Sequence, residues 1–118
     1  MTPEQLTLAV AGYASEAKAE AIVLLDLRKL TSVADYFLIC TGRSERQVKA
    51  IHDRVHLGMK QDHGVLPARV DGAAQARWVL MDYGDVIVHV FVPDLREFYR
   101  LEQLWGEAPA RAFELAAP

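Results

Sequence analysis

Two short apolar runs constrain this chain more strongly than any other feature of its sequence. Residues 22–27 are branched and apolar up to Asp26, and residues 36–41 carry no charged side chain. Runs of this length and composition are typical of strands that are buried on both faces of a sheet. Such a sheet needs helices packed against it, so the two runs predict a layered fold of helices and strands.

Two amphipathic segments supply helices for these layers. Residues 2–19 begin with a capping-box sequence at Thr2, and their apolar positions then recur every three or four residues. Residues 44–63 begin with a second capping-box sequence at Ser44 and end before Gly64, a residue type suited to a helix C-terminus. We therefore expect one amphipathic helix before the first apolar run and another after the second.

The rest of the chain predicts further strands and a last helix. Residues 65–70 are interrupted by Pro67, which is typical of a short edge strand. Residues 77–83 and 86–92 flank a Gly-Asp turn and predict a hairpin, and a helix follows over residues 93–105. The order of elements predicts a single α/β (α+β) domain, with a mixed sheet of about five strands and flanking helices.

The C-terminal region divides into this last helix and a tail. Phe98, Leu101 and Trp105 recur at helical spacing and share one apolar face. Residues 107–118 are rich in Ala and Pro, and we expect them to form a disordered tail. The predicted domain therefore covers residues 1–106.

The charge balance restricts the kind of partner. Lys and Arg number 13 and Asp and Glu number 16, which gives a formal net charge of −3. This balance argues against sequence-specific binding to naked nucleic acid, because such binding depends on many cationic contacts to phosphates. It suits a basic protein partner, since complementary fields speed the encounter.

Cysteine content and hydropathy indicate the compartment. The single cysteine, Cys40, lies in an apolar run, where a buried and reduced thiol is expected. No apolar stretch approaches the roughly 20 residues that span a bilayer, and the first residues do not form a secretory signal. We expect a cytoplasmic protein that does not enter a membrane.

One pair of histidines has the spacing of a metal site. His52 and His56 lie one helical turn apart, as in zinc proteases, but Asp53 stands where those enzymes carry a Glu. Spacing supplies no third ligand, although folding could bring His63 or His89 close. A helix flank that faces solvent is the favoured interpretation, so no metal site is predicted.

Two other segments have both a chemical and a structural interpretation. Residues 42–44 (Gly-Arg-Ser) precede a helix and could hold an anion, but a strand-to-helix turn with an N-cap needs the same residues. Asp82 and Asp85 flank a turn and could act as an acid–base pair, but turns use Asp for backbone reasons. Nothing nearby supplies a nucleophile or a third ligand. We therefore predict no catalytic residue and no cofactor.

Three motifs occur in a recognisable order along the chain. They are residues 34–48 (ADYFLICTGRSERQV), residues 78–91 (WVLMDYGDVIVHVF) and residues 96–105 (REFYRLEQLW). Together they resemble the ribosomal silencing factor RsfS family, also called Iojap-like, and the Asp-Gly pair at residues 71–72 fits the resemblance. The match runs in register from the first helix to Trp105.

The resemblance implies a translation regulator that is not an enzyme. The family fold is similar to that of nucleotidyltransferases but lacks their Gly-Ser and paired-Asp active-site pattern. Its members bind the large ribosomal subunit at the intersubunit face, through the fourteenth of the large-subunit proteins. This blocks joining of the small subunit and represses translation when nutrients are limiting. Family members often pair when they are free, and the apolar first helix and the exposed strand edges of this chain permit a homodimer but leave the oligomeric state open.

We expect the docking face on the strand that carries Trp78. Strand alternation puts Trp78, Leu80 and Asp82 on one side. An aromatic anchor with a charged rim is typical of protein interfaces, although core packing also accounts for Trp78. The predicted partner-binding residues are Trp78, Asp82, Tyr83 and Asp85 at the centre, with Arg43, Arg77 and His89 as neighbours.

Two alternatives use the same fold differently. A nucleotide-binding or nucleotidyltransferase-like enzyme would hold phosphate at the helix start after residues 42–44, and saturable binding of nucleoside triphosphates would reveal it. A metal hydrolase built on His52 and His56 would contain stoichiometric zinc.

Overall fold

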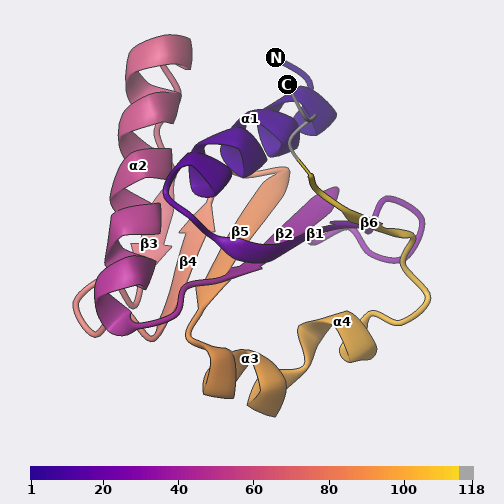
Figure 1. The fold of residues 1–118 in the computed structure, drawn as a ribbon. Coiled ribbons are helices and arrows are strands. Elements are labelled where there is room, and N and C mark those ends of the chain that lie inside the picture. The colour runs from indigo at the N-terminus through magenta and orange to yellow at the C-terminus, as the bar shows by residue number, and fades with distance from the viewer. Residues whose placement is uncertain (115–118) are drawn as a thin grey trace.

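A mixed sheet forms the centre of the molecule (Figure 1). The computed structural model describes residues 1–114. Within them the strands are β1 (Glu20–Asp26), β2 (Tyr36–Thr41), β3 (Arg69–Asp71), β4 (Trp78–Asp82), β5 (Val86–Phe91) and β6 (Ala110–Ala112). They lie in the order β3-β4-β5-β2-β1-β6, with β2 and β5 parallel and all other neighbours antiparallel. The predicted fold class is confirmed, with six strands in place of about five.

The helices lie on both sides of this sheet. They are α1 (Pro3–Glu16), α2 (Glu45–His63), α3 (Pro93–Tyr99) and α4 (Leu101–Leu104). The long helices α1 and α2 pack on one face, whereas the short α3 and α4 lie on the opposite side, next to the smaller apolar cluster (Figure 1). No helix within residues 1–114 is both long and apolar enough to cross a membrane.

Both long helices begin at the predicted caps. The Thr2 hydroxyl accepts a hydrogen bond from the Gln5 amide, and the Gln5 side chain accepts one from the Thr2 amide, which completes a capping box. The Ser44 hydroxyl caps α2 by accepting from the Gln47 amide. At the other end of α2, Gly64 adopts the left-handed conformation with φ of 66°.

Two apolar clusters fill the two sides of the sheet. The larger lies under α1 and α2 and contains fully buried side chains such as Leu38, Ile51 and Val55. The smaller lies on the opposite face around Phe37 and Phe91, where α3 and α4 contribute partly buried side chains. The face under α1 and α2 is therefore closed, and the other face is covered only in part.

The C-terminal tail differs from the prediction. Residues 110–112 form β6, which pairs antiparallel with β1 at the sheet edge. The pairing satisfies backbone groups of β1 that an edge strand would leave to water, and the Asp26 amide donates to the Pro109 carbonyl. Hydrogen bonding to the edge strand β1 therefore orders a segment whose composition predicts disorder. Residues 115–118 of the expected tail lie outside the described residues.

The last helix is not continuous. Arg100 adopts φ of 48°, which ends α3 and starts α4 in a new direction. Leu101 and Trp105 pack against the smaller cluster as their shared face suggests, but Phe98 turns outward and is 76% exposed. A left-handed arginine carries no sequence signal, because the residue types that mark such positions are Gly and Asn.

Candidate functional site

The partly covered face of the sheet carries an exposed aromatic surface. The register between β4 and β5 sets Trp78 opposite Phe91, and Leu80 opposite His89. Farther along the pair, Asp82 lies opposite Ile87. We call this surface the open face, and it consists of Trp78, Leu80, Asp82 and Ile87 from the strands with Phe98 and Tyr99 from α3.

Trp78 is held at one end of the open face by aromatic contacts. Its indole stacks on Phe91 with ring centroids 4.8 Å apart, and the Tyr99 ring lies 4.7 Å away. Its Nε1 donates to Nδ1 of His89 at 3.1 Å. The indole is nevertheless only half-buried. Trp78 therefore packs against the protein and is also partly accessible at the surface.

Helix α3 extends this aromatic surface with two side chains that the sequence prediction missed. Tyr99 is 46% exposed and contacts Trp78, and the Phe98 ring stands 5.0 Å from that of Tyr99. The available signal is a pair of adjacent aromatic residues between charged ones, over residues 96–100. Two neighbouring aromatics on a helix cannot both face the core.

His89 lies beneath the open face, not on it. Its side chain is 4% exposed, and burial lowers its pKa to about 4, so the imidazole is neutral at neutral pH. Nδ1 accepts from Trp78, while Nε2 has no hydrogen-bond partner within residues 1–114. His89 therefore lies next to Trp78, but it is buried more deeply than a residue that contacts a partner directly.

The hairpin carboxylates lie at the far end of the open face. Asp82 is four residues from Trp78, which at about 3.3 Å per residue is roughly 13 Å along the strand. Its Oδ1 accepts from the Gly84 amide at 2.8 Å, so it supports the turn. Asp85 is exposed, and its carbonyl accepts from the amides of Asp35 and Tyr36. Both residues have the turn roles that we weighed against acid–base chemistry.

The structure places three predicted site residues elsewhere. Tyr83 packs against the larger cluster on the closed face, where burial raises its pKa to about 12. This follows from the strand alternation that puts Asp82 on the open face. Arg77 lies 3.3 Å from Asp94, at the Trp78 end of the strand but outside the open face. Arg43 pairs with Glu20 at 2.8 Å and lowers the pKa of that carboxyl.

The two segments considered for phosphate and metal serve local structure. A Cβ on Gly42 would stand 2.8 Å from Val48, so residues 42–44 form a tight turn into α2. The His52 and His56 rings lie 5.9 Å apart, and His63 contacts Tyr13 instead of joining them. Within residues 1–114 no group of three side chains of His, Cys, Asp or Glu is placed to hold a metal.

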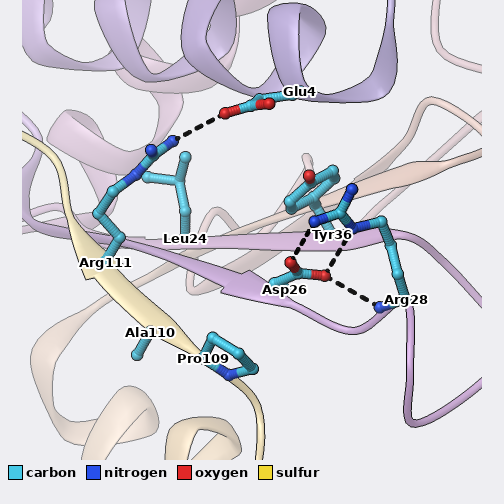
Figure 2. Close-up of a pocket in the computed structure, with 8 residues that line it drawn as sticks. All are labelled: Glu4, Leu24, Asp26, Arg28, Tyr36, Pro109, Ala110 and Arg111. Atoms are coloured by element: carbon cyan, nitrogen blue, oxygen red, sulfur yellow. Dashed lines mark hydrogen bonds and ion pairs between the residues drawn. The ribbon is translucent and has the colours of Figure 1, made fainter.

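A hollow of about 240 Å³ lies between α1 and the β1–β6 edge (Figure 2). The Arg28 guanidinium binds both carboxylate oxygens of Asp26 at 2.6 and 2.9 Å and lies over the Tyr36 ring. Across the hollow, Arg111 of β6 lies 3.6 Å from Glu4 of α1. Each of these four charges has a partner of the opposite sign, so the hollow ties β6 to the domain and offers no uncompensated charge to a ligand.

Comparison with known proteins identifies the family. A family model described as "Ribosomal silencing factor during starvation" matches residues 1–117. The chain belongs to the RsfS family. The match continues through the C-terminal segment that the sequence motifs left out, which is consistent with the ordered β6.

Individual RsfS relatives match over most of the chain. The ribosomal silencing factor RsfS of Halalkalibacterium halodurans is 43% identical over 114 residues, which cover 97% of each chain. A crystal structure of a Chromobacterium violaceum protein superposes with a TM-score of 0.86 at 34% identity, covering 100% of this chain and 95% of that one. A mouse protein named "Mitochondrial assembly of ribosomal large subunit protein 1" is 36% identical over 76 residues, covering 60% of this chain and 32% of the mouse protein.

Proposed function

We propose that this RsfS-family chain docks through its open face on the large ribosomal subunit and prevents the small subunit from joining. The docking partner is the fourteenth protein of the large subunit, at the intersubunit face. The protein thereby represses translation during nutrient limitation, in the cytoplasm and without catalysis. Occupation of a surface needs only affinity and steric overlap, so the function requires no cofactor and no metal.

The observation that carries the proposal is the exposed aromatic surface of an otherwise well-covered sheet. Trp78 and Tyr99 are in contact, half-buried and exposed respectively, and Phe98 extends the surface beyond them. Contiguous exposed aromatic groups of this kind mark protein-binding sites, because Trp and Tyr contribute most of the binding energy at interfaces. The closed face has no comparable group of aromatic side chains in the part of the chain that is described.

Charge around the open face supports a basic partner. Asp82 lies on the open face, and Asp71, Asp85 and Asp94 lie at its rim. The guanidinium groups of Arg69 and Arg77 are each paired with one of these rim carboxylates, Asp71 and Asp94 respectively. The rim is therefore acidic, like the whole chain with its net charge of −3. An acidic rim around an apolar centre suits a cationic protein surface and disfavours direct contact with RNA phosphates.

The family names support the ribosomal target. Relatives are named ribosomal silencing factor, and the name of the mouse relative refers to assembly of the large ribosomal subunit. The nucleotidyltransferase-like alternative has less support, since Ser44 is engaged as a helix cap and Arg43 is paired with Glu20.

Binding to isolated large subunits tests the proposal directly. In a co-sedimentation assay we expect Trp78→Ala to weaken binding by about 30-fold, because a central aromatic anchor contributes roughly 2 kcal/mol or more. Leu57→Ala is the matched control, because Leu57 is 46% exposed on α2, on the closed side of the molecule. The control should bind like the wild type.

A subunit-joining assay tests the consequence of binding. A saturating amount of the wild-type protein should keep small subunits from joining the large ones, and Trp78→Ala should need about 30-fold more protein for the same block. Free joining in the presence of saturating wild-type protein would contradict the proposal. So would wild-type affinity of a folded Trp78→Ala variant.

A further inference from the structure

We propose that His89 is a positioning residue for Trp78. Its buried imidazole accepts the indole N–H and thereby fixes the orientation in which Trp78 meets its partner protein. This inference rests on the proposed docking function and adds a residue that acts through Trp78 without touching the partner.

The contact geometry identifies the acceptor atom. Nε1 of Trp78 lies 3.1 Å from Nδ1 of His89, and the two ring centroids are 6.0 Å apart. Indole N–H is a donor only, so Nδ1 must be unprotonated to accept it. Burial keeps the pKa of His89 at about 4, and the neutral imidazole therefore carries its single proton on Nε2. One tautomer of His89 is selected, and it presents a fixed acceptor to the tryptophan.

The surroundings of His89 show that this residue lowers the stability of the folded protein. Its cross-strand neighbours are Ile39 and Leu80, and the Phe37 ring packs against it edge-to-face at 4.7 Å. In this apolar setting Nε2 finds no hydrogen-bond partner among residues 1–114. A buried polar atom without a partner destabilises the folded state. An aliphatic side chain would fit the same setting without that cost, so the contribution of the histidine lies in the hydrogen bond to Trp78.

The hydrogen bond determines which edge of the indole faces the partner. A half-exposed tryptophan can direct its N–H to water, but the N–H of Trp78 points to the buried ring of His89 on the neighbouring strand. The hydrocarbon part of the ring is then left at the surface, beside Tyr99. A fixed indole loses less rotational freedom on binding, which favours the complex.

The deciding experiment compares two substitutions of His89. His89→Leu removes the acceptor and keeps an aliphatic volume, whereas His89→Asn places an amide oxygen near the position of Nδ1. We expect His89→Leu to bind large subunits about 3- to 10-fold more weakly, the equivalent of one immobilised side chain. His89→Asn should bind within about two-fold of the wild type. Stability to urea should rank in the opposite order, with His89→Leu the more stable variant.

A spectroscopic measurement on the free protein follows the same hydrogen bond. The chain has two tryptophans, and Trp105→Phe leaves the indole N–H signal of Trp78 alone in a ¹⁵N spectrum. His89→Leu should shift this signal and accelerate its exchange with water, and His89→Asn should restore slow exchange. Equal exchange rates of this signal in the wild type, His89→Leu and His89→Asn would contradict the hydrogen bond.

A double-mutant cycle separates this inference from the docking function. Phe has no N–H, so His89→Leu should cost no further affinity in a Trp78→Phe background. If Trp78→Ala weakens binding and His89→Leu does not, the docking function stands and the positioning role is overturned. Equal losses for His89→Leu and His89→Asn would also overturn it, because the acceptor would then be irrelevant. If Trp78→Ala binds normally, the docking function itself is wrong.

Discussion

The two faces of the sheet are formed by the same strands but differ in how completely they are covered. Under α1 and α2, side chains such as Leu38 and Val55 are fully buried, and both helices begin at well-formed caps. On the open face, α3 and α4 contribute no fully buried residue, and aromatic rings stand partly in solvent. The closed face buries the larger of the two apolar clusters, which allows the open face to keep an exposed phenylalanine and, beneath it, a buried histidine.

The sharpest test of this division is a pair of leucine truncations. Leu38→Ala on the closed face should lower the free energy of unfolding by about 2–5 kcal/mol, because it leaves a cavity in a fully packed layer. Leu80→Ala on the open face should cost less than about 1.5 kcal/mol, because Leu80 is only half-buried. Urea denaturation gives both values. Binding to large subunits should show the reverse pattern, with only Leu80→Ala weakened, and parallel losses in both assays would contradict the division.

The stability of the open face should depend on acidic pH through His89. The folded-state pKa is about 4, below the ordinary value of 6.5, so the unfolded chain takes up a proton first as the pH falls. The free energy of unfolding is therefore unaffected by His89 above pH 6.5. Between pH 6.5 and 4 it falls, by about 3 kcal/mol at most, because the folded protein holds the imidazole neutral.

Denaturation curves across this range, for the wild type and for His89→Leu, measure the effect. The variant should lose less stability than the wild type between pH 6.5 and 4, because it has no group at this position to protonate. Identical pH profiles would show that the imidazole is not held neutral by its burial.

Two glycines test the packing of the closed face. A Cβ on Gly58 would stand 2.6 Å from the Tyr13 ring, where α1 and α2 meet, whereas a Cβ on Gly12 would meet nothing within 4 Å. Gly58→Ala should therefore destabilise the fold by about 1–3 kcal/mol. Gly12→Ala should stabilise α1 by about 0.5–1 kcal/mol. Thermal unfolding of both variants checks the signs, and a destabilised Gly12→Ala would contradict the assignment of space around α1.

The closed face could be predicted from the sequence because its signals are local. The capping residue Thr2, the helix-ending Gly64 and the uncharged run over residues 36–41 each act within a few residues, and the structure confirms the helices and strands they predict. The predicted docking residues include Tyr83, which packs on the closed face, and the alternation that puts Asp82 on the open face also puts Tyr83 on the other side.

The rest depends on contacts between distant residues. Strand β6 forms because β1 offers an edge, and nothing in residues 110–112 indicates this partner. The hydrogen bond of His89 to Trp78 joins neighbouring strands, and its direction depends on the rotamers of both side chains. The exposure of Phe98 follows from the helix break at Arg100, which the sequence does not mark.

The helix break at Arg100 allows a last comparison of the closed and open faces. Helices α2 and α3 both end at a residue in the left-handed conformation. Helix α2 ends at Gly64 with φ of 66°, and α3 ends at Arg100 with φ of 48°. Glycine adopts this region without strain, whereas arginine pays a steric cost of about 1 kcal/mol or more. Arg100→Gly should therefore stabilise the fold by about 0.5–1 kcal/mol, after the greater freedom of glycine in the unfolded chain is taken into account. Gly64→Ala should destabilise it by a similar amount, and thermal unfolding measures both. If Arg100→Gly is instead destabilising, the hydrogen bond from Arg100 Nε to the Glu97 carbonyl outweighs the backbone strain. Side-chain contacts would then hold the end of α3 more firmly than its exposed aromatic residues suggest.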